Sequence, residues 1–506
     1  MTGKDATMGA TTALLGIDLG TSAVKAVILD LEGRLLGEGR AEYALLTRRP
    51  GWAESIPADW WRATRLAVRE ARERAPQCRI AGVGLAGQMH GVVMVAADGQ
   101  PTRAAMLWPD RRAEKVLARF RALPSALRQR LANPLVPGMA GPLLCWLAEH
   151  EPACYARSAR ALLPKDWLRL RLTARRSTTE VTSGLVTEAS DASATLLYDL
   201  PADRWAEEVI AALGLRFDLL PPLLPSAAQA GTLSSEAAAA LELPSGLPVA
   251  TGAADVAAAL LGAGVLAPGT LLLSLGTGAQ LVLLCEEPQP DPTLRTHLYR
   301  AADGRHWYRM AAVQNAGLVL DWLRRQLHAE WSEVYASLEQ VPPGAEGLTF
   351  LPTLTPERPH YNGPQTGAFV GLRLEHSRAH LLRSALEGVA CGIRLALERL
   401  PGAGEVSSLL VAGGGSLHPA WRQLLADLLG RPLLSLEAAE TTARGAALLG
   451  GLAAGVWSEG QELARLAPAR SVVTTPGEQQ ARCAALYARY LELLARGRET
   501  GTPLGP

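Results

Sequence analysis

Several features common in other protein classes are missing from this chain of 506 residues. No charge of one sign dominates, because 50 basic and 49 acidic residues leave a net charge of +1. Without a strong electrostatic field, nucleic acid and acidic membranes are poor candidate partners. Gly and Pro, at 49 and 34 residues, are abundant enough for many turns but not for a low-complexity chain.

Cysteine is sparse and unpatterned. The six cysteines are scattered, with neither a C-x-x-C pair nor a metal-ligand spacing, at positions 78, 145, 154, 285, 391 and 483. A chain of this length does not need disulfide bonds to fold, so we expect reduced thiols. The first twelve residues lack the charged-then-apolar plan of a signal peptide. Together these absences predict a cytoplasmic protein.

Only one stretch resembles a membrane span. Residues 256–285 carry no charge, but Pro268-Gly269 and residues 276–278 divide them. The pieces predict a buried helix followed by two strands rather than a transmembrane helix.

Common catalytic and nucleotide-binding motifs are also absent. Gly3-Lys4 is followed by Asp5, so no Walker A loop is present, and there is no G-x-S-x-G, H-E-x-x-H or post-strand Rossmann fingerprint. A nucleotide site, if the chain has one, must be of another kind.

The local patterns that are present predict an α/β fold. Residues 14–40 alternate as strand, turn, strand, turn and strand. Asp59 is the expected N-cap of a helix over residues 60–74, and a short buried strand over 80–85 ends near Gly87. Strands that alternate with helices are typical of α/β proteins.

A short repeat suggests two related lobes. The triplet Leu-Gly-Thr at residues 19–21 returns at residues 275–277, 256 positions later, each time between two predicted strands. Turn residues at 243–246 favour a boundary there, and two such lobes would face each other across a ligand-binding cleft. A third glycine cluster, residues 413–416, joins a strand over 409–412 to a helix over 419–429, where backbone amides can approach phosphate. The Ala- and Gly-rich residues 440–452 predict a tightly packed helix.

Asp18 is the first candidate functional residue. It ends a buried strand and is followed by Gly20, Thr21 and Ser22, whose amides and hydroxyls could hold phosphate oxygens. A carboxylate there could bind Mg²⁺, which bridges to phosphate. Alternatively, Asp18 caps a β-turn, and the spacing favours neither interpretation.

Asp255 is the second candidate. It is the lone charge among some thirty apolar or small residues and is expected near the start of a helix. It could be a simple N-cap, as Asp often is. Alternatively, it could be a general base whose pKa burial has raised.

A polar pocket wall is predicted at residues 86–91, which read AGQMHG. Gln88, Met89 and His90 follow a buried strand and could face a ligand, although a lone histidine is commonly structural. Trp52, on a loop over residues 50–54, could stack on a sugar or anchor the loop.

Taken together, these segments resemble the FGGY family of carbohydrate kinases, and its xylulokinase group most closely. Residues 16–22 resemble the family's first phosphate loop, and AGQMHG resembles the sugar-binding motif of the xylulokinases. The resemblance runs from about residue 14 to residue 455. Further similar segments are residues 107–112, 163–168, 190–193, 273–277, 367–372 with 380–387, and 413–415.

The resemblance implies two actin-like ATPase lobes of the ribonuclease-H type around a central cleft. It implies lobes over residues 12–245, for sugar, and 246–460, for ATP, then a helical segment with a disordered tail over 461–506. It makes Asp255 the expected catalytic base and Asp18 the expected Mg²⁺ ligand. The other expected contacts are Gln88, Met89, His90, Asp110 and Trp52 for the sugar, and Gly20, Thr21, Ser22, Gly276, Thr277, Gly413, Gly414 and Gly415 for the phosphates of ATP.

The implied reaction is transfer of the γ-phosphoryl group of MgATP to a ketopentose, D-xylulose, giving D-xylulose 5-phosphate. Val256 stands where the family has an Asn expected to bind the sugar, Pro109 replaces another polar residue, and residues 355–358 replace Ser-Gly-Glu-Arg. A different pentulose or polyol is therefore the first alternative. A non-catalytic sensor of sugar and nucleotide, or an actin-like ATPase, is the second. A homodimer is expected from the family alone.

Overall fold

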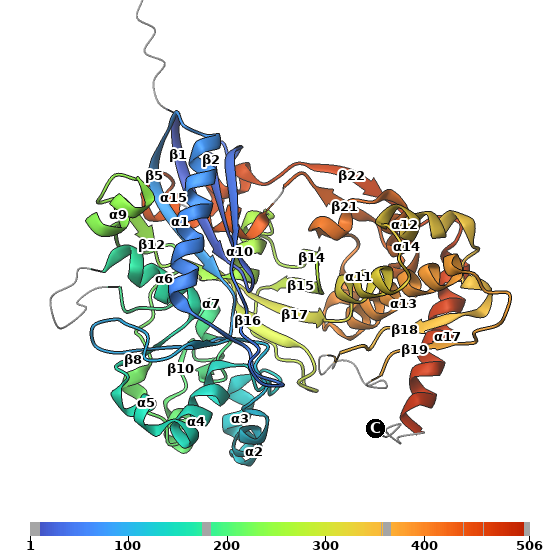
Figure 1. Cartoon of the computed structure of the whole chain (residues 1–506), viewed down its shortest axis with the longest axis horizontal. Helices are drawn as coiled ribbons and strands as arrows, with labels where there is room; N and C mark the ends of the chain where they lie inside the picture. The colour runs from blue at the N-terminus through green and yellow to red at the C-terminus, as the bar shows by residue number, and fades with distance from the viewer. Residues whose placement is uncertain are drawn as a thin grey trace, which may run out of the picture. The chain divides into compact units, whose positions relative to one another are not determined.

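The computed structural model describes residues 11–174, 184–355, 357, 366–438, 440–458 and 460–499. The chain forms two compact units, each assembled from separate segments (Figure 1). The first comprises Met1–Leu266, Tyr299–Trp307 and Glu440–Ala467, and the second comprises Ala267–Leu298, Tyr308–Ala439 and Pro468–Pro506. The contiguous domain boundaries expected from the sequence stay a prediction.

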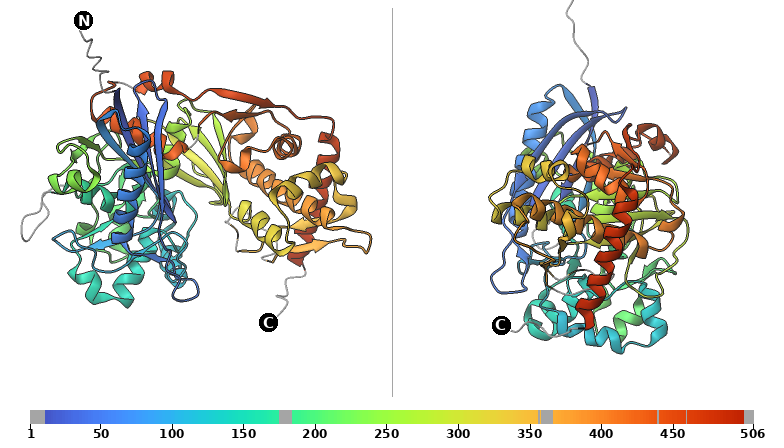
Figure 2. Two further views of the ribbon diagram at one scale, coloured as in Figure 1. Left: turned by 45° about the horizontal axis from the view of Figure 1, so that its top comes forward. Right: turned by 90° about the vertical axis from the view of Figure 1, so that its right-hand side faces the viewer.

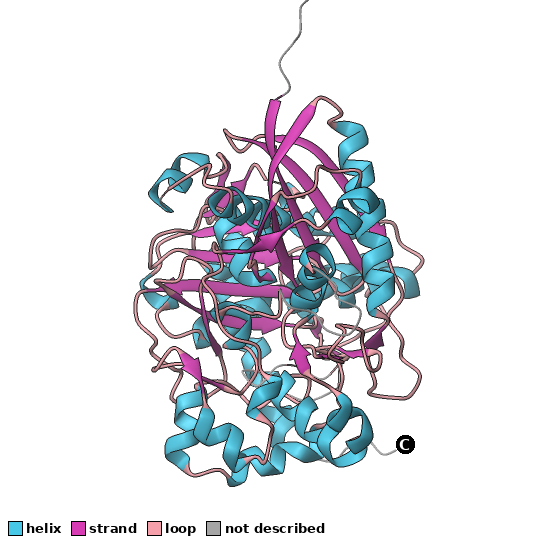
Figure 3. Cartoon of the chain, turned by 90° about the vertical axis from the view of Figure 1, so that its left-hand side faces the viewer, coloured by secondary structure: helices cyan, strands magenta, loops and turns pink. Residues whose placement is uncertain are grey.

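A sheet in the order β11-β12-β5-β1-β2-β3, with β13 beside β5, is the centre of the first unit. Because side chains alternate across a strand, Leu15 and Ile17 pack toward α1 whereas Leu14 packs toward α15. Helices thus cover both faces of the sheet (Figure 3). The elements are β1 (Thr11–Leu19), β2 (Ala23–Asp30), β3 (Leu35–Glu42), β5 (Cys78–Gly87), β11 (Gln229–Thr232), β12 (Pro248–Ala250), β13 (Ala253–Ala254), α1 (Pro57–Arg74) and α15 (Thr441–Ala453).

The second unit repeats the opening arrangement of the first. Strands β1 and β2 form an antiparallel hairpin, and β1 also pairs in parallel with β5. In the same way β14 (Leu271–Leu275) pairs antiparallel with β15 (Ala279–Cys285) and parallel with β20 (Leu409–Ala412). The two related lobes predicted from the repeated triplet are therefore confirmed at the level of strand topology.

Helices surround the sheet of the second unit. The long helix α13 (Arg378–Arg399) contributes much of its core, and α17 (Gln480–Glu499) packs against α13 and α14 (Pro419–Leu429) (Figure 2). The full sheet order is β16-β17-β15-β14-β20-β21-β22, where the strands not yet named are β16 (His297–Arg300), β17 (Trp307–Val313), β21 (Leu433–Leu436) and β22 (Arg470–Thr474).

Two local predictions are corrected. Helix α1 begins at Pro57 after Ile56, so Asp59 is not its N-cap; proline fits the first helical turn, where its missing N–H is not needed. Asp59 instead pairs with Arg62. Within the helical segment and tail at residues 461–506, the sequence predicts disorder from residue 497, but α17 continues to Glu499; residues 500–506 lie outside the described residues.

The uncharged stretch at residues 256–285 forms α10 (Asp255–Gly262) followed by β14 and β15, as predicted. In the described part of the chain, no helix combines the length and the hydropathy needed to cross a bilayer.

Candidate functional site

Three strand ends bring the candidate sugar-side residues together in the first unit. Strand β5 lies parallel to both β1 and β13, with Gly87 beside Leu19 on one side and Ala254 on the other. The carboxyl ends of these strands therefore share one edge of the sheet. Asp18, the AGQMHG motif and Asp255 lie at or directly after these ends.

Asp18 is buried and lies opposite Lys25 in the β1–β2 hairpin. Burial is the main cause that raises the pKa of Asp18 to about 7; the negative charge of Asp255 adds to it, and Lys25 opposes it. Lys25 forms an ion pair of 2.5 Å with Glu440, the residue directly before α15. Oδ1 of Asp18 is buried without a hydrogen-bond partner.

Asp255 is the first residue of α10, and the N-cap position belongs to Ala254. The N-cap interpretation is therefore wrong. Oδ1 of Asp255 accepts a hydrogen bond of 2.7 Å from the amide of Val256. Burial raises the pKa of Asp255 to about 6, while that amide opposes the shift. A carboxylate with this pKa can take up a proton near neutral pH.

The first Gly-Thr turn is fixed by polar side chains. Tyr43 donates a hydrogen bond to the carbonyl of Gly20, and Nε2 of Gln88 donates to the same oxygen at 3.3 Å. Nε1 of Trp108 donates to Oγ1 of Thr21 at 2.9 Å, which leaves the Thr21 hydroxyl hydrogen able to reach a ligand. Ser22 is exposed on the same turn.

The AGQMHG residues are buried at the strand edge. Oε1 of Gln88 has no hydrogen-bond partner. Nδ1 of His90 lies 2.8 Å from the carbonyl of Ala194. Because a carbonyl only accepts, Nδ1 carries the proton, and a neutral ring then presents Nε2 as an acceptor. His90 also has φ of +74°, an unfavourable value for a non-glycine residue and one that clusters at functional sites. Met89 is buried beside it.

Asp110 and Trp52 are occupied by contacts within the protein. The carboxylate of Asp110 is fully buried; it forms an ion pair of 2.7 Å with Arg112 and accepts from the amide of Ala53 at 2.7 Å. The guanidinium of Arg112 lies 3.5 Å from the ring centroid of Trp52, and Trp146 meets that ring edge-on. These contacts favour loop positioning over direct sugar binding for both residues.

The second unit contains a cavity of about 660 Å³ that collects the other predicted phosphate-loop residues. Gly276 and Thr277 line it, as do Gly414 and Gly415. A Cβ atom on Gly414 would meet nothing within 4 Å, so this backbone is open to a ligand. Gly413 does not line the cavity; its φ of +92° makes the turn beside Leu275.

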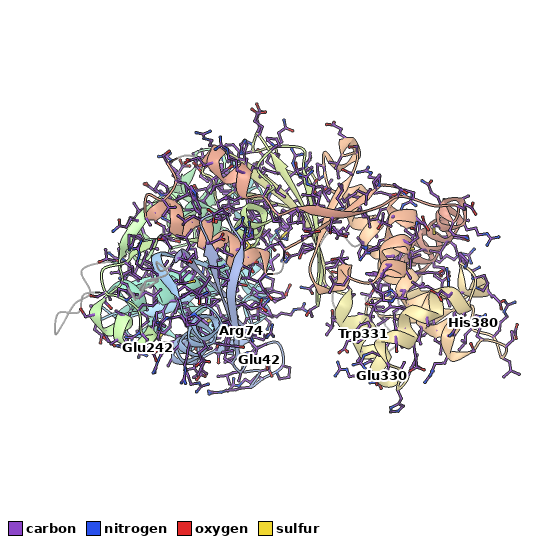
Figure 4. All side chains as sticks on the ribbon, turned by 90° about the horizontal axis from the view of Figure 1, so that it is seen from above. Glu42, Arg74, Glu242, Glu330, Trp331 and His380 are labelled. Carbon is purple, nitrogen blue, oxygen red and sulfur yellow. The ribbon has the colours of Figure 1, made fainter. Side chains whose placement is uncertain are left out.

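Sequence reasoning missed the aromatic wall of this cavity. Trp331 and Tyr335, from α12 (Trp331–Gln340), line it together with Trp421 (Trp331 is labelled in Figure 4). The Tyr335 ring stacks on His418 with centroids 4.0 Å apart. The i, i+4 spacing of Trp331 and Tyr335 puts both on one helix face, but no local signal says what that face meets.

A second missed element holds the loop at the end of β17. The side-chain amide of Asn315 donates to Glu357 at 2.8 Å, and its oxygen accepts from the amides of Leu354 and Thr355. Glu357 belongs to the segment flagged as a departure, of which Pro356 and Arg358 lie outside the described residues. This clamp lies directly before α11 (Gly317–Gln326), whose first residues line the cavity.

The described residues contain no group of three or more His, Cys, Asp or Glu side chains that could hold a metal ion by themselves. Mg²⁺ needs less from a protein, because it keeps waters and is commonly bound by one or two carboxylates with substrate phosphates. The unpartnered Oδ1 of Asp18 fits that requirement.

Comparison with known proteins covers nearly the whole chain. Residues 13–262 match the N-terminal domain of the FGGY family of carbohydrate kinases, and residues 271–454 match its C-terminal domain. Xylulose kinase of Bacillus subtilis is 32% identical over 457 residues, 89% of either chain. A structure from Brucella ovis, described as a xyloylose kinase, is 34% identical and superposes with a TM-score of 0.87, covering 96% of this chain and 100% of its own. Glycerol kinase of Methylibium petroleiphilum is 32% identical over 503 residues, 94% of this chain and 98% of its own.

Proposed function

This chain belongs to the FGGY family of carbohydrate kinases, and from that premise we propose that it phosphorylates D-xylulose with MgATP to give D-xylulose 5-phosphate and ADP. The observation that carries the proposal is the shared edge of β1, β5 and β13. There a carboxylate of raised pKa, Asp255, lies next to the AGQMHG strand end. The names of the relatives, xylulose kinase among them, support the choice of sugar.

Asp255 would act as the general base. Its carboxylate takes the proton of the sugar's terminal hydroxyl as the oxygen forms a bond to the γ-phosphorus. The bond from that phosphorus to the β–γ bridging oxygen breaks, and ADP leaves with the electron pair. Such reactions depend mainly on positioning and on stabilisation of charge.

The remaining predicted residues would bind and stabilise. Thr21, Thr277 and the amides of their turns would donate hydrogen bonds to phosphoryl oxygens. Asp18 would hold Mg²⁺, which when bound neutralises phosphate charge. His90 and Gln88 have acceptor atoms suited to sugar hydroxyls. Assembly as a homodimer belongs to this proposal on the strength of the family alone.

A polyol such as glycerol is the competing substrate. Val256 lacks the amide expected to bind the sugar, and a hydroxyl left unpaired in a closed site costs about 1–3 kcal/mol. The glycerol kinase relative is as similar in identity as the xylulose kinase.

The test is a coupled assay of ADP release with a panel of D-xylulose, D-ribulose, glycerol and gluconate at fixed MgATP. We expect the highest kcat/KM with D-xylulose. A higher value with glycerol would replace the proposed substrate. Binding of sugar and nucleotide without sugar-dependent ADP release would indicate a sensor instead.

A further inference from the structure

A set of fully buried ionic side chains in the first unit has no part in the proposed chemistry. We call it the buried charged cluster, and its members are Lys165, Asp166, Arg169, Glu188 and Asp191, each 0% exposed. The ammonium group of Lys165 lies 2.7 Å from Asp166, 2.9 Å from Asp191 and 3.3 Å from Glu188. Arg169 pairs with Asp166 at 2.7 Å.

A buried set of charged side chains stabilises a protein core poorly. Removing charges from water costs several kcal/mol per ion, and well-packed apolar side chains commonly do as well or better. Two cations face three carboxylates here, and burial together with the neighbouring carboxylates Glu188 and Asp166 raises the pKa of Asp191 well above its ordinary range. The arrangement therefore calls for an explanation other than stability.

The backbone just before Asp255 is held at two points, directly by Arg169 of the cluster and by Ser190, a neighbour that the cluster fixes. Nη1 of Arg169 donates to the carbonyl of Thr251 at 2.7 Å. The hydroxyl of Ser190 accepts from the amide of Ala254 at 2.9 Å. Ser190 is fixed in turn, because Glu188 accepts from its amide at 2.6 Å as the N-cap of α7 (Ala189–Ala192).

The sheet also holds this backbone. Ala253 and Ala254 pair with Ala86 and Gly87 of β5. Gly252 has φ of +91°, and a Cβ atom on it would lie 2.5 Å from the carbonyl of Leu85. The segment therefore lies against β5 and is also tied to the cluster.

We propose that the buried charged cluster positions the Asp255 carboxylate by fixing the backbone of residues 251–254. The cluster makes no contact with substrate in this account; Ser190 and Arg169 act through that backbone. The inference rests on the proposed role of Asp255 as the base. A misplacement of about 1 Å can cost about 10²-fold in rate, so a few hydrogen bonds can matter much more to kcat than to folding.

Ser190→Ala tests the proposal, because it removes the hydroxyl oxygen that accepts from the Ala254 amide. The substitution changes the volume of the side chain very little. Ser158→Ala is the matched control; this buried serine of the same unit donates to the carbonyl of Cys154 at 2.8 Å. We expect Ser190→Ala to lower kcat about tenfold or more, with the KM for ATP unchanged and a melting temperature close to that of the control.

The pH profile supplies a readout that a merely structural serine would not move. A displaced backbone weakens the bond from the Val256 amide to Asp255, so the acid limb of kcat/KM should move to higher pH. The other charged groups of this site are unchanged in the variant. They are Asp18 and the Lys25–Glu440 ion pair, whose charges act on Asp18.

Equal kcat and an unmoved acid limb in Ser190→Ala would overturn the proposal. Should that variant not fold, Glu188→Gln, which keeps the side-chain shape and removes a charge, is judged by the same criteria. Sugar-dependent ADP release by the unmodified protein decides the proposed function separately. If the unmodified protein is an active kinase and Ser190→Ala changes neither kcat nor the acid limb, only the positioning role is refuted.

Discussion

Asp18 and Asp255 are two carboxyl groups at one sheet edge with different surroundings. Asp18 is the more deeply buried and has an unpartnered oxygen, and the charge of Asp255 adds to the effect of burial on its pKa. Asp255 keeps part of its surface exposed and accepts from one amide. This difference agrees with separate roles, a cation ligand and a proton acceptor.

The pH dependence of catalysis should report the base. Asp255 must be ionised to accept a proton, and its pKa is raised to about 6. We expect kcat/KM for the sugar to be constant above about pH 7 and to fall toward tenfold per pH unit well below 6. Initial rates from pH 4.5 to 8.5 at constant ionic strength check this. A rate independent of pH down to 5 would exclude Asp255 as the base.

The ionised carboxylate of Asp18 should destabilise the folded protein at high pH. Its folded-state pKa of about 7 exceeds the ordinary value of 3.8, so the folded state binds the proton more tightly than the unfolded state. The free energy of unfolding therefore decreases as pH rises from about 4 through 7. Asp18→Asn should raise the melting temperature at pH 8 by on the order of a few degrees, and by less at pH 5.

Differential scanning calorimetry without ligands measures this effect. Asp98→Asn, in an exposed turn, is the control and should show no pH-dependent gain. A lower melting temperature for Asp18→Asn than for the unmodified protein at pH 8 would contradict the description of this carboxyl group.

At the scale of elements, glycine allows α15 to lie directly on the sheet. A Cβ atom on Gly16 would lie 2.0 Å from the carbonyl of Ala443, and one on Gly84 would lie 1.7 Å from that of Ala446. Gly445 makes a similar approach to Ala258 of α10. The Ala- and Gly-rich composition that predicted tight packing is confirmed by these contacts. They also hold Glu440, at the start of α15, within reach of Lys25.

Gly84→Ala should disrupt this packing. The added methyl group meets backbone that cannot move alone, so we expect a loss of about 2 kcal/mol or more, or no soluble folded protein. Gly404→Ala, where a Cβ atom would meet nothing within 4 Å, should change stability by less than about 0.5 kcal/mol. Urea unfolding of both variants gives the comparison. Equal stability of the two would show that α15 does not lie this close.

The aromatic face of α12 should contribute to nucleotide affinity. Tyr335 lines the cavity with Trp331, and its ring stacks on that of His418. Stacking with an aromatic base is worth about 0.5–1.5 kcal/mol. We therefore expect Tyr335→Ala to weaken ADP binding about 3- to 10-fold in isothermal titration calorimetry.

The control for this change is Trp322→Ala, on an exposed aromatic side chain of α11 outside the cavity lining. It should leave the Kd for ADP unchanged. An unaltered Kd for ADP in Tyr335→Ala would show that the aromatic base of the nucleotide does not bind at this face of α12.

At the scale of the whole molecule, local patterns predicted most of the fold. The repeated Leu-Gly-Thr triplet marks equivalent hairpins in both units, and the strand–helix order gave the α/β class. The helix over residues 419–429 has the predicted bounds. Asp59 misled because a charged N-cap residue and a first-turn residue look alike in sequence, and Pro57 decides between them.

Contacts across long sequence separations could not be predicted. Lys25 and Glu440 are 415 positions apart. In the buried charged cluster, Lys165, Asp166 and Asp191 lie in segments flagged only by resemblance, whereas Arg169 and Glu188 lie just outside them. Trp331 and Tyr335, in the wall of the cavity of the second unit, come from a helix that was not singled out. The identity of such partners depends on the three-dimensional arrangement, whereas strands, turns and glycine loops are encoded by neighbouring residues.

The most direct measurement compares the products formed by the unmodified protein and by Asp255→Asn, incubated with D-xylulose and MgATP and analysed by ³¹P NMR. Asparagine keeps the shape of the side chain but cannot take up the hydroxyl proton. We expect a sugar phosphate monoester from the unmodified protein and a rate at least ~10²-fold lower from the variant, with an unchanged circular dichroism spectrum. Sugar phosphate formed at a similar rate by both proteins would contradict the account.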